Sequence, residues 1–144
     1  MDPFARKMWR AGICFAAMML FLLAVLSVVY LHEHPFCPDR LVTESSSPSG
    51  QWTAAILERR CGTEAPFFTR VNLRRARPLH RGFLSGHVTD GTVLVIEQDA
   101  AGAGVNVAWS SPKTLTIRCP HCSSNFIHQR DSQWNGIIIR YDLP

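Results

Sequence analysis

The feature that most constrains this chain is an uninterrupted apolar segment close to its N-terminus. From Ala11 to Leu31 the sequence reads AGICFAAMMLFLLAVLSVVYL and contains no charged residue. A helix of this length extends ~31 Å, and the hydrocarbon core of a bilayer is ~30 Å thick. The rest of the chain is too short to surround such a helix as the core of a soluble protein. The segment is therefore predicted to be a transmembrane helix, or uncleaved signal anchor.

The charges beside this segment predict its orientation. Arg6, Lys7 and Arg10 precede it, whereas histidines and acidic residues follow it. By the positive-inside rule, residues 1–10 are expected in the cytoplasm and residues 32–144 across the inner membrane, in the periplasm or another extracytoplasmic space. Cleavage as a signal peptide is the alternative. Against it, the apolar run exceeds the usual ~7–15 residues and no Ala-x-Ala site follows.

The remainder of the chain shows the periodicity of β-strands. Residues 32–50 are rich in Pro and Ser and are expected to form a juxtamembrane linker that ends in a turn. In residues 51–144, alternating or β-branched side chains form short runs at 51–59, 69–73, 92–96, 105–109, 115–117 and 137–141. Turn residues separate these runs. The pattern predicts a mainly β protein, in which one transmembrane helix precedes a small antiparallel β-sandwich or meander.

The predicted location affects how the cysteines are interpreted. Cys14 lies inside the apolar segment, and four cysteines follow it: Cys37, Cys61, Cys119 and Cys122. Disulfides form and persist outside the cytoplasm. Four cysteines allow three pairings, and the sequence alone does not choose among them. Proximity along the chain favours Cys37 with Cys61 and Cys119 with Cys122.

The motif Cys119-Pro-His-Cys122 permits three interpretations. Disulfide oxidases of the thioredoxin superfamily carry the same four residues, but their first cysteine begins a helix, and no helical stripe follows here. A zinc site would need two more ligands; His128 is the candidate to complete a set with the two cysteines, beside His121. The third interpretation, which the β periodicity favours, is a structural disulfide on the loop that joins the last two strands.

A run of arginines is the clearest candidate for a ligand surface. The segment from Ala65 to Thr89 has no acidic residue. Its basic residues are Arg70, Arg74, Arg75, Arg77 and Arg81. Such a run could bind anionic lipid headgroups, lipopolysaccharide phosphates or an acidic envelope protein. The alternative is a solvated loop whose arginines keep the domain soluble.

No arrangement of residues in the sequence points to catalysis. The serine run at 45–47 has no Gly-x-Ser-x-Gly context, and Gly102 and Gly104 lack the strand and helix that a phosphate-binding loop needs. No cofactor is predicted. The predicted compartment excludes nucleic acid as a partner, despite the net charge of +4. The expectation is a non-enzymatic domain that binds a partner or serves the envelope structurally, with thiol–disulfide or metal handling by the Cys-Pro-His-Cys motif as the alternative.

One stretch of the sequence resembles a known family. Residues 47–73, SPSGQWTAAILERRCGTEAPFFTRVNL, are similar to a family of uncharacterised small bacterial envelope proteins with a domain of unknown function. The resemblance extends over residues 47–141 through a Trp, a Ser-Pro turn and a final Gly-x-x-x-x-Tyr strand. The chain departs from the family at Ser49 and at residues 64–65. The resemblance implies a membrane-proximal β-domain in which a cysteine before the first strand pairs with Cys61, and it implies no activity.

Overall fold

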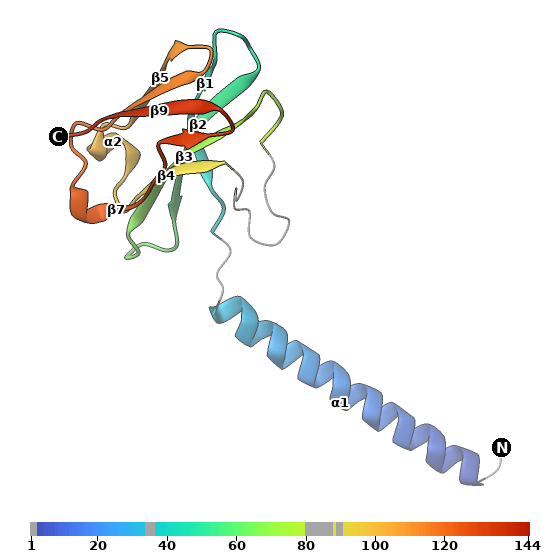
Figure 1. Ribbon diagram of the computed structural model, residues 1–144. Coiled ribbons are helices and arrows are strands. Elements are labelled where there is room, and N and C mark those ends of the chain that lie inside the picture. The colour runs from blue at the N-terminus through green and yellow to red at the C-terminus, as the bar shows by residue number, and fades with distance from the viewer. Residues whose placement is uncertain (1–2, 34–36, 80–87, 89–90) are drawn as a thin grey trace. The chain divides into compact units, whose positions relative to one another are not determined.

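The computed structural model describes residues 3–33, 37–79, 88 and 91–144, and the chain forms two compact units, Met1–Pro35 and Phe36–Pro144. The first unit is helix α1, Pro3–Glu33 (Figure 1). From Met8 to His32 it is long and apolar enough to cross a membrane. The helix predicted from the apolar segment is confirmed, and it fits a single-pass membrane anchor.

The second unit consists of two β-sheets packed face to face (Figure 1). Sheet A has the strand order β1-β2-β3-β4-β7, and sheet B has the order β5-β6-β9-β8. The strands of sheet A are β1 Arg40–Ser46, β2 Trp52–Arg60, β3 Phe67–Arg75, β4 Thr92–Ile96 and β7 Ile127–Arg130. Those of sheet B are β5 Asn106–Ser111, β6 Thr114–Arg118, β8 Gln133–Trp134 and β9 Ile137–Asp142. The predicted fold class, a mainly β domain after an N-terminal helix, is confirmed.

The core lies between the inner faces of the two sheets. In β3, Val71 and Leu73 are fully buried and pack with Leu115 and Ile117 of β6 and Ile137 of β9. These positions follow the period of two that strands impose, because successive side chains point to opposite faces of a sheet. The alternation that predicted β3 therefore identifies its core-facing side correctly.

The outer face of sheet A is also partly covered. Ala55 and Leu57 of β2 are fully buried there, in a separate small cluster with Val88 and the half-buried Leu79. This second cluster explains why β2 is apolar on both faces, a pattern typical of a strand covered on both sides. Polar side chains on this face consequently have to find partners within the protein.

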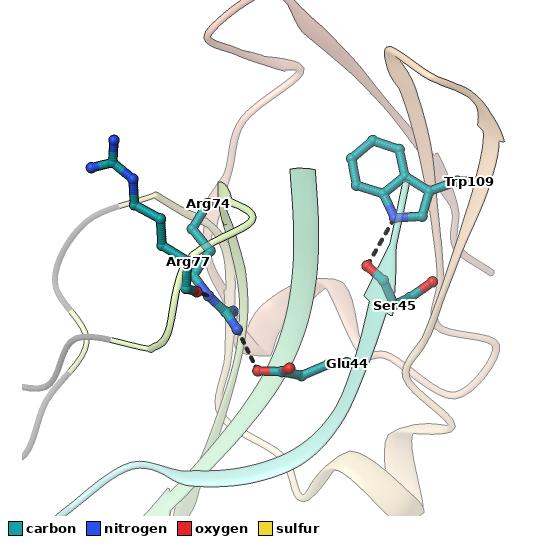
Figure 2. A network of polar contacts seen from close by, with 5 residues as sticks. All are labelled: Glu44, Ser45, Arg74, Arg77 and Trp109. Atoms are coloured by element: carbon teal, nitrogen blue, oxygen red, sulfur yellow. Dashed lines mark hydrogen bonds and ion pairs between the residues drawn. The ribbon is translucent and has the colours of Figure 1, made fainter. Parts of the chain in front are cut away.

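Two side chains, Trp109 and Tyr141, form hydrogen bonds that connect the sheets. Trp109 of β5 donates its Nε1–H to the carbonyl oxygen of Ser45 in β1, at 3.0 Å (Figure 2). The hydroxyl of Tyr141 in β9 lies 3.0 Å from the carbonyl oxygen of Val93 in β4 and 2.7 Å from that of Asp131. Burial, and then the charge of Asp131, raises the pKa of Tyr141 to about 12.

The structure corrects three details of the predicted organisation. The segment 32–50, predicted to be a linker, contains strand β1. Five of the first six residues of this strand are exposed, so its sequence lacks the alternation of apolar and polar residues that predicts a strand. The predicted loop 98–104 contains a short helix, α2, at Ala100–Ala103, capped by Asp99. Strands β6 and β9 are parallel, because the chain crosses to β7 in sheet A before it returns.

The bond between Trp109 and Ser45 can be tested by substitution. Trp109→Phe should lower the free energy of unfolding by about 1–3 kcal/mol, because it leaves a half-buried carbonyl without its donor. Urea denaturation of the full chain in neutral detergent, followed by near-UV circular dichroism, measures the change. Trp134→Phe is the matched control, since the Trp134 ring packs on Trp52 at 5.6 Å. Equal losses in both variants would attribute the effect to ring volume rather than to the hydrogen bond.

Candidate functional site

The predicted arginine patch is divided by the geometry of β3. Residues at even positions of this strand point to the outer face of sheet A, where Arg70 and Arg74 lie. Arg75 points the other way and is the direct cross-strand partner of Trp52. Arg77 follows the strand, and Arg81 lies outside the described residues. The sequence run therefore supplies two pairs of arginines in different surroundings.

The outer-face arginines are held by carboxylates of the segment that leads into and forms β1. Arg70 Nη1 lies 3.8 Å from Asp39 Oδ2, whose side chain is fully buried. The same carboxylate oxygen accepts the backbone N–H of Val88 at 2.7 Å. Arg59 lies on the same face, and its pKa is lowered, chiefly by burial and then by the charge of Arg70. Arg70 is consequently part of the packing of this face.

Arg74 joins three segments of the domain. Its Nη2 pairs with Glu44 of β1, and its Nε donates to the carbonyl oxygen of Arg77 at 3.0 Å. Figure 2 shows that the guanidinium of Arg77 points away from this network. Arg74 therefore fixes the backbone of the turn after β3 while the Arg77 side chain extends from it.

The other two arginines line an open pocket where β2 begins and β3 ends. Its volume is about 470 Å³, and its walls are Gln51, Trp52, Arg75, Ala76 and Arg77. The Arg75 guanidinium carbon lies 5.6 Å from the centre of the Trp52 ring, within the range of cation–π contacts. Both arginines and Gln51 are exposed, and Trp52 is half-buried. The pocket thus combines two cations, an amide and an indole.

Backbone hydrogen bonds hold the walls of this pocket in place. The backbone N–H of Ala76 donates to the carbonyl oxygen of Gln51 at 2.9 Å, and the backbone N–H of Arg77 donates to the carbonyl oxygen of Arg75 at 2.6 Å. The Trp134 ring meets Trp52 edge-on at 5.6 Å and 82°. Glycine is required at position 91 beside this pair, since its φ is +75° and a Cβ there would lie 1.9 Å from the Leu73 carbonyl oxygen and 3.2 Å from the Trp134 ring. Gln51 and Trp52 were not predicted as site residues. Trp52 lies directly across from Arg75 and Gln51 is bonded to Ala76, and this arrangement becomes visible only when β2 and β3 are paired.

The Cys-Pro-His-Cys motif forms a buried disulfide between Cys119 and Cys122. Cys119 directly follows β6, and the side chains of the two cysteines are 0% and 4% exposed. A 3₁₀ turn, Ser124–Phe126, follows the motif, and no α-helix starts at Cys119. The motif lies between the strands predicted at 115–117 and 137–141, but β7 and β8 intervene before the second of them, so the chain crosses here from sheet B to sheet A rather than forming one loop. Burial limits attack by an external thiolate, because exchange requires access to a sulfur.

The residues of the alternative metal site are engaged separately. Cys119 and Cys122 are bonded to each other, and His128 Nε2 lies 3.0 Å from Glu97 Oε2. Within the part of the chain that the structure describes, no group of three or more His, Cys, Asp or Glu side chains is placed to hold a metal ion.

Comparison of the chain with protein-family models, with curated proteins and with solved structures found no match. The resemblance to the envelope family therefore stays a prediction, and the function must be inferred from the chain's own geometry.

The second disulfide joins the entry of the domain to the end of β2. Cys37 and Cys61 are 24 positions apart, and their Cα atoms are 5.3 Å apart. In the chain-entropy account, a bridge closing a loop of this length contributes about 3–4 kcal/mol. For a small domain this is a large share of the net stability of ~5–15 kcal/mol.

Removal of this bridge should be costly. Cys61→Ser is expected to lower the free energy of unfolding by about 2–5 kcal/mol and to leave Cys37 open to alkylation. Denaturation of the full chain and mass spectrometry after alkylation measure the two effects. Cys14→Ser is the control, since Cys14 is a free cysteine outside the β-domain. A Cys37 that stays blocked in the Cys61 variant would contradict the pairing.

The Cys119–Cys122 pair should behave as a structural bridge. Its reduction by mild thiols is expected to be slow, and Pro120→Ala with His121→Ala should barely change the reduction potential. Redox equilibration with glutathione buffers, followed by alkylation, measures the potential. A Cys119 thiolate already present at neutral pH in the folded reduced protein, and lost in the variant, would identify a redox centre instead.

Proposed function

We propose that this protein is a single-pass membrane protein that presents a non-enzymatic binding domain outside the cytoplasm. In this proposal α1 remains as the anchor, its N-terminus is cytoplasmic, and the β-sandwich lies on the periplasmic side of the inner membrane. The resemblance to bacterial envelope proteins agrees with this placement.

The observation that carries the proposal is the pairing of all four cysteines of the β-domain behind a membrane-length apolar helix. Disulfides persist in oxidising compartments and are rare where glutathione and thioredoxin keep thiols reduced. The basic residues Arg6, Lys7 and Arg10 support a cytoplasmic N-terminus. Binding is favoured over catalysis because the described residues that line the pocket beside Trp52 supply cations, an amide and an indole but no nucleophile or carboxylate.

The alternative is thiol–disulfide exchange by Cys119 and Cys122. It has the motif in its favour, whereas the burial of both side chains favours a structural bridge. Measurement of the reduction potential of this pair and titration of its thiols distinguish thiol–disulfide exchange from a structural role.

The topology can be measured with reporters fused after Pro144. A reporter that is active only after export should be active there, and one that requires the cytoplasm should be inactive. Arg6→Glu, Lys7→Glu and Arg10→Glu together should reduce export, because they reverse the charge bias. An active cytoplasmic reporter behind the parent chain would disprove the orientation, and a mature chain beginning near Val28 would disprove the anchor.

Crosslinking in intact cells tests the binding role. A photoreactive residue in place of Gln51 should give discrete adducts, and the same residue in place of the exposed Ala108 on sheet B should not. A chain that crosslinks equally at both positions, or at neither, would contradict a binding role for the pocket end of the domain.

A further inference from the structure

We infer that the pocket beside Trp52 binds an acidic sugar, meaning a phosphate or carboxylate group carried on a saccharide ring. This ligand class rests on the proposed function, since it specifies what the exported domain binds. The pocket's volume of about 470 Å³ falls within the ~300–1,000 Å³ that is usual for small-molecule sites.

The charge of the pocket indicates an anion. Arg70 and Arg74 are engaged by Asp39 and Glu44, and thus stabilise the outer face of sheet A. Among the residues that the structure describes, Arg75 and Arg77 form no ion pair with a carboxylate, and no acidic side chain lines the pocket. The guanidinium group of each arginine presents paired N–H donors, whose geometry matches that of phosphate and carboxylate oxygens.

The remaining lining residues indicate that the anion is carried on a ring with hydroxyl groups. Trp52 contributes an indole that packs against the Trp134 ring at an interplanar angle of 82°, so its position is constrained before a ligand arrives. The Arg75 guanidinium lies over this ring, and the apolar surface that it leaves uncovered would gain dispersion energy from the C–H face of a sugar ring. The exposed amide of Gln51 has two donors and an acceptor, which suit neighbouring hydroxyl groups.

The backbone around the pocket is preorganised for this task. Ala76 is hydrogen-bonded to Gln51, and the Arg77 carbonyl oxygen is held by Arg74, which is itself fixed by Glu44. The side chains of Arg75 and Arg77 therefore extend from a constrained turn. A constrained site loses less conformational freedom on binding, and affinity benefits accordingly.

The test separates the anion from the ring by using four probes on the full chain in neutral detergent. Glucose 6-phosphate and glucuronate carry both features, inorganic phosphate has only the anion, and glucose has only the ring. Calorimetry and saturation-transfer NMR should show that the first two bind about tenfold or more tightly than the last two, a difference of ~1.4 kcal/mol. The stronger of the two acidic sugars identifies whether phosphate or carboxylate is preferred.

Matched variants connect the binding to this pocket. Arg75→Gln with Arg77→Gln should weaken both acidic sugars about tenfold or more. Arg118→Gln with Arg140→Gln removes the same charge from exposed positions of sheet B and should leave binding unchanged. Equal weakening in the two double variants would show unspecific attraction and overturn the inference. Near-UV circular dichroism checks that each variant is folded.

Two further outcomes would also overturn the inference. One is the absence of binding by both acidic sugars at about 10 mM, which would saturate a site with a millimolar Kd. The other is binding only to vesicles that contain phosphatidylglycerol, lost in the Arg75 and Arg77 variant, which would assign the pocket to lipid headgroups. Either result leaves the topology and crosslinking tests unaffected, so failure of the ligand class is distinguishable from failure of the proposed function.

Discussion

The domain depends on how sheet A accommodates arginines on a face that is partly covered. Burying a cation costs free energy unless a carboxylate and hydrogen bonds accompany it. Glu44 accepts a hydrogen bond from Arg74, and Asp39 supplies a charge partner for Arg70 at 3.8 Å; both carboxylates come from the segment around β1. Arginines of the central strand β3 thus hold the edge strand β1. Their side chains reach β1 across β2, where the small side chain of Ala55 leaves room for them.

The two disulfides contribute to stability in different ways. The bridge from Cys37 to Cys61 closes a long loop and restricts the unfolded chain substantially. The bridge from Cys119 to Cys122 closes a loop of only a few residues, for which the same account gives about 2 kcal/mol. Its position is more informative, since it shapes the turn by which the chain leaves sheet B for sheet A. There His121 N–H bonds to the Ala103 carbonyl oxygen, which also lies 3.4 Å from the Cys119 sulfur.

Much of the fold could be predicted from the sequence, and the exceptions have physical causes. Helix α1 and strand β3 carry strong local patterns, one of hydropathy and one of alternation. Strand β1 has no such pattern because most of its side chains are exposed, and β8 has only two residues. Successive residues of a strand point to opposite faces of the sheet, so the different surroundings of Arg74 and Arg75 could have been predicted from the sequence. The pocket itself could not be predicted, because Gln51 and Trp52 are brought to it only by the pairing of β2 with β3.

The hydrogen bond from Trp109 to Ser45 also bears on association between copies of the chain. Edge strands with free backbone groups are templates for pairing with other molecules. Strands β1 and β5 are edges of different sheets, and this bond holds one against the other. The opposite edges, β7 and β8, have four and two residues. A protein attached to a membrane meets its own copies at raised effective concentration, and short or covered edges reduce its tendency to aggregate there.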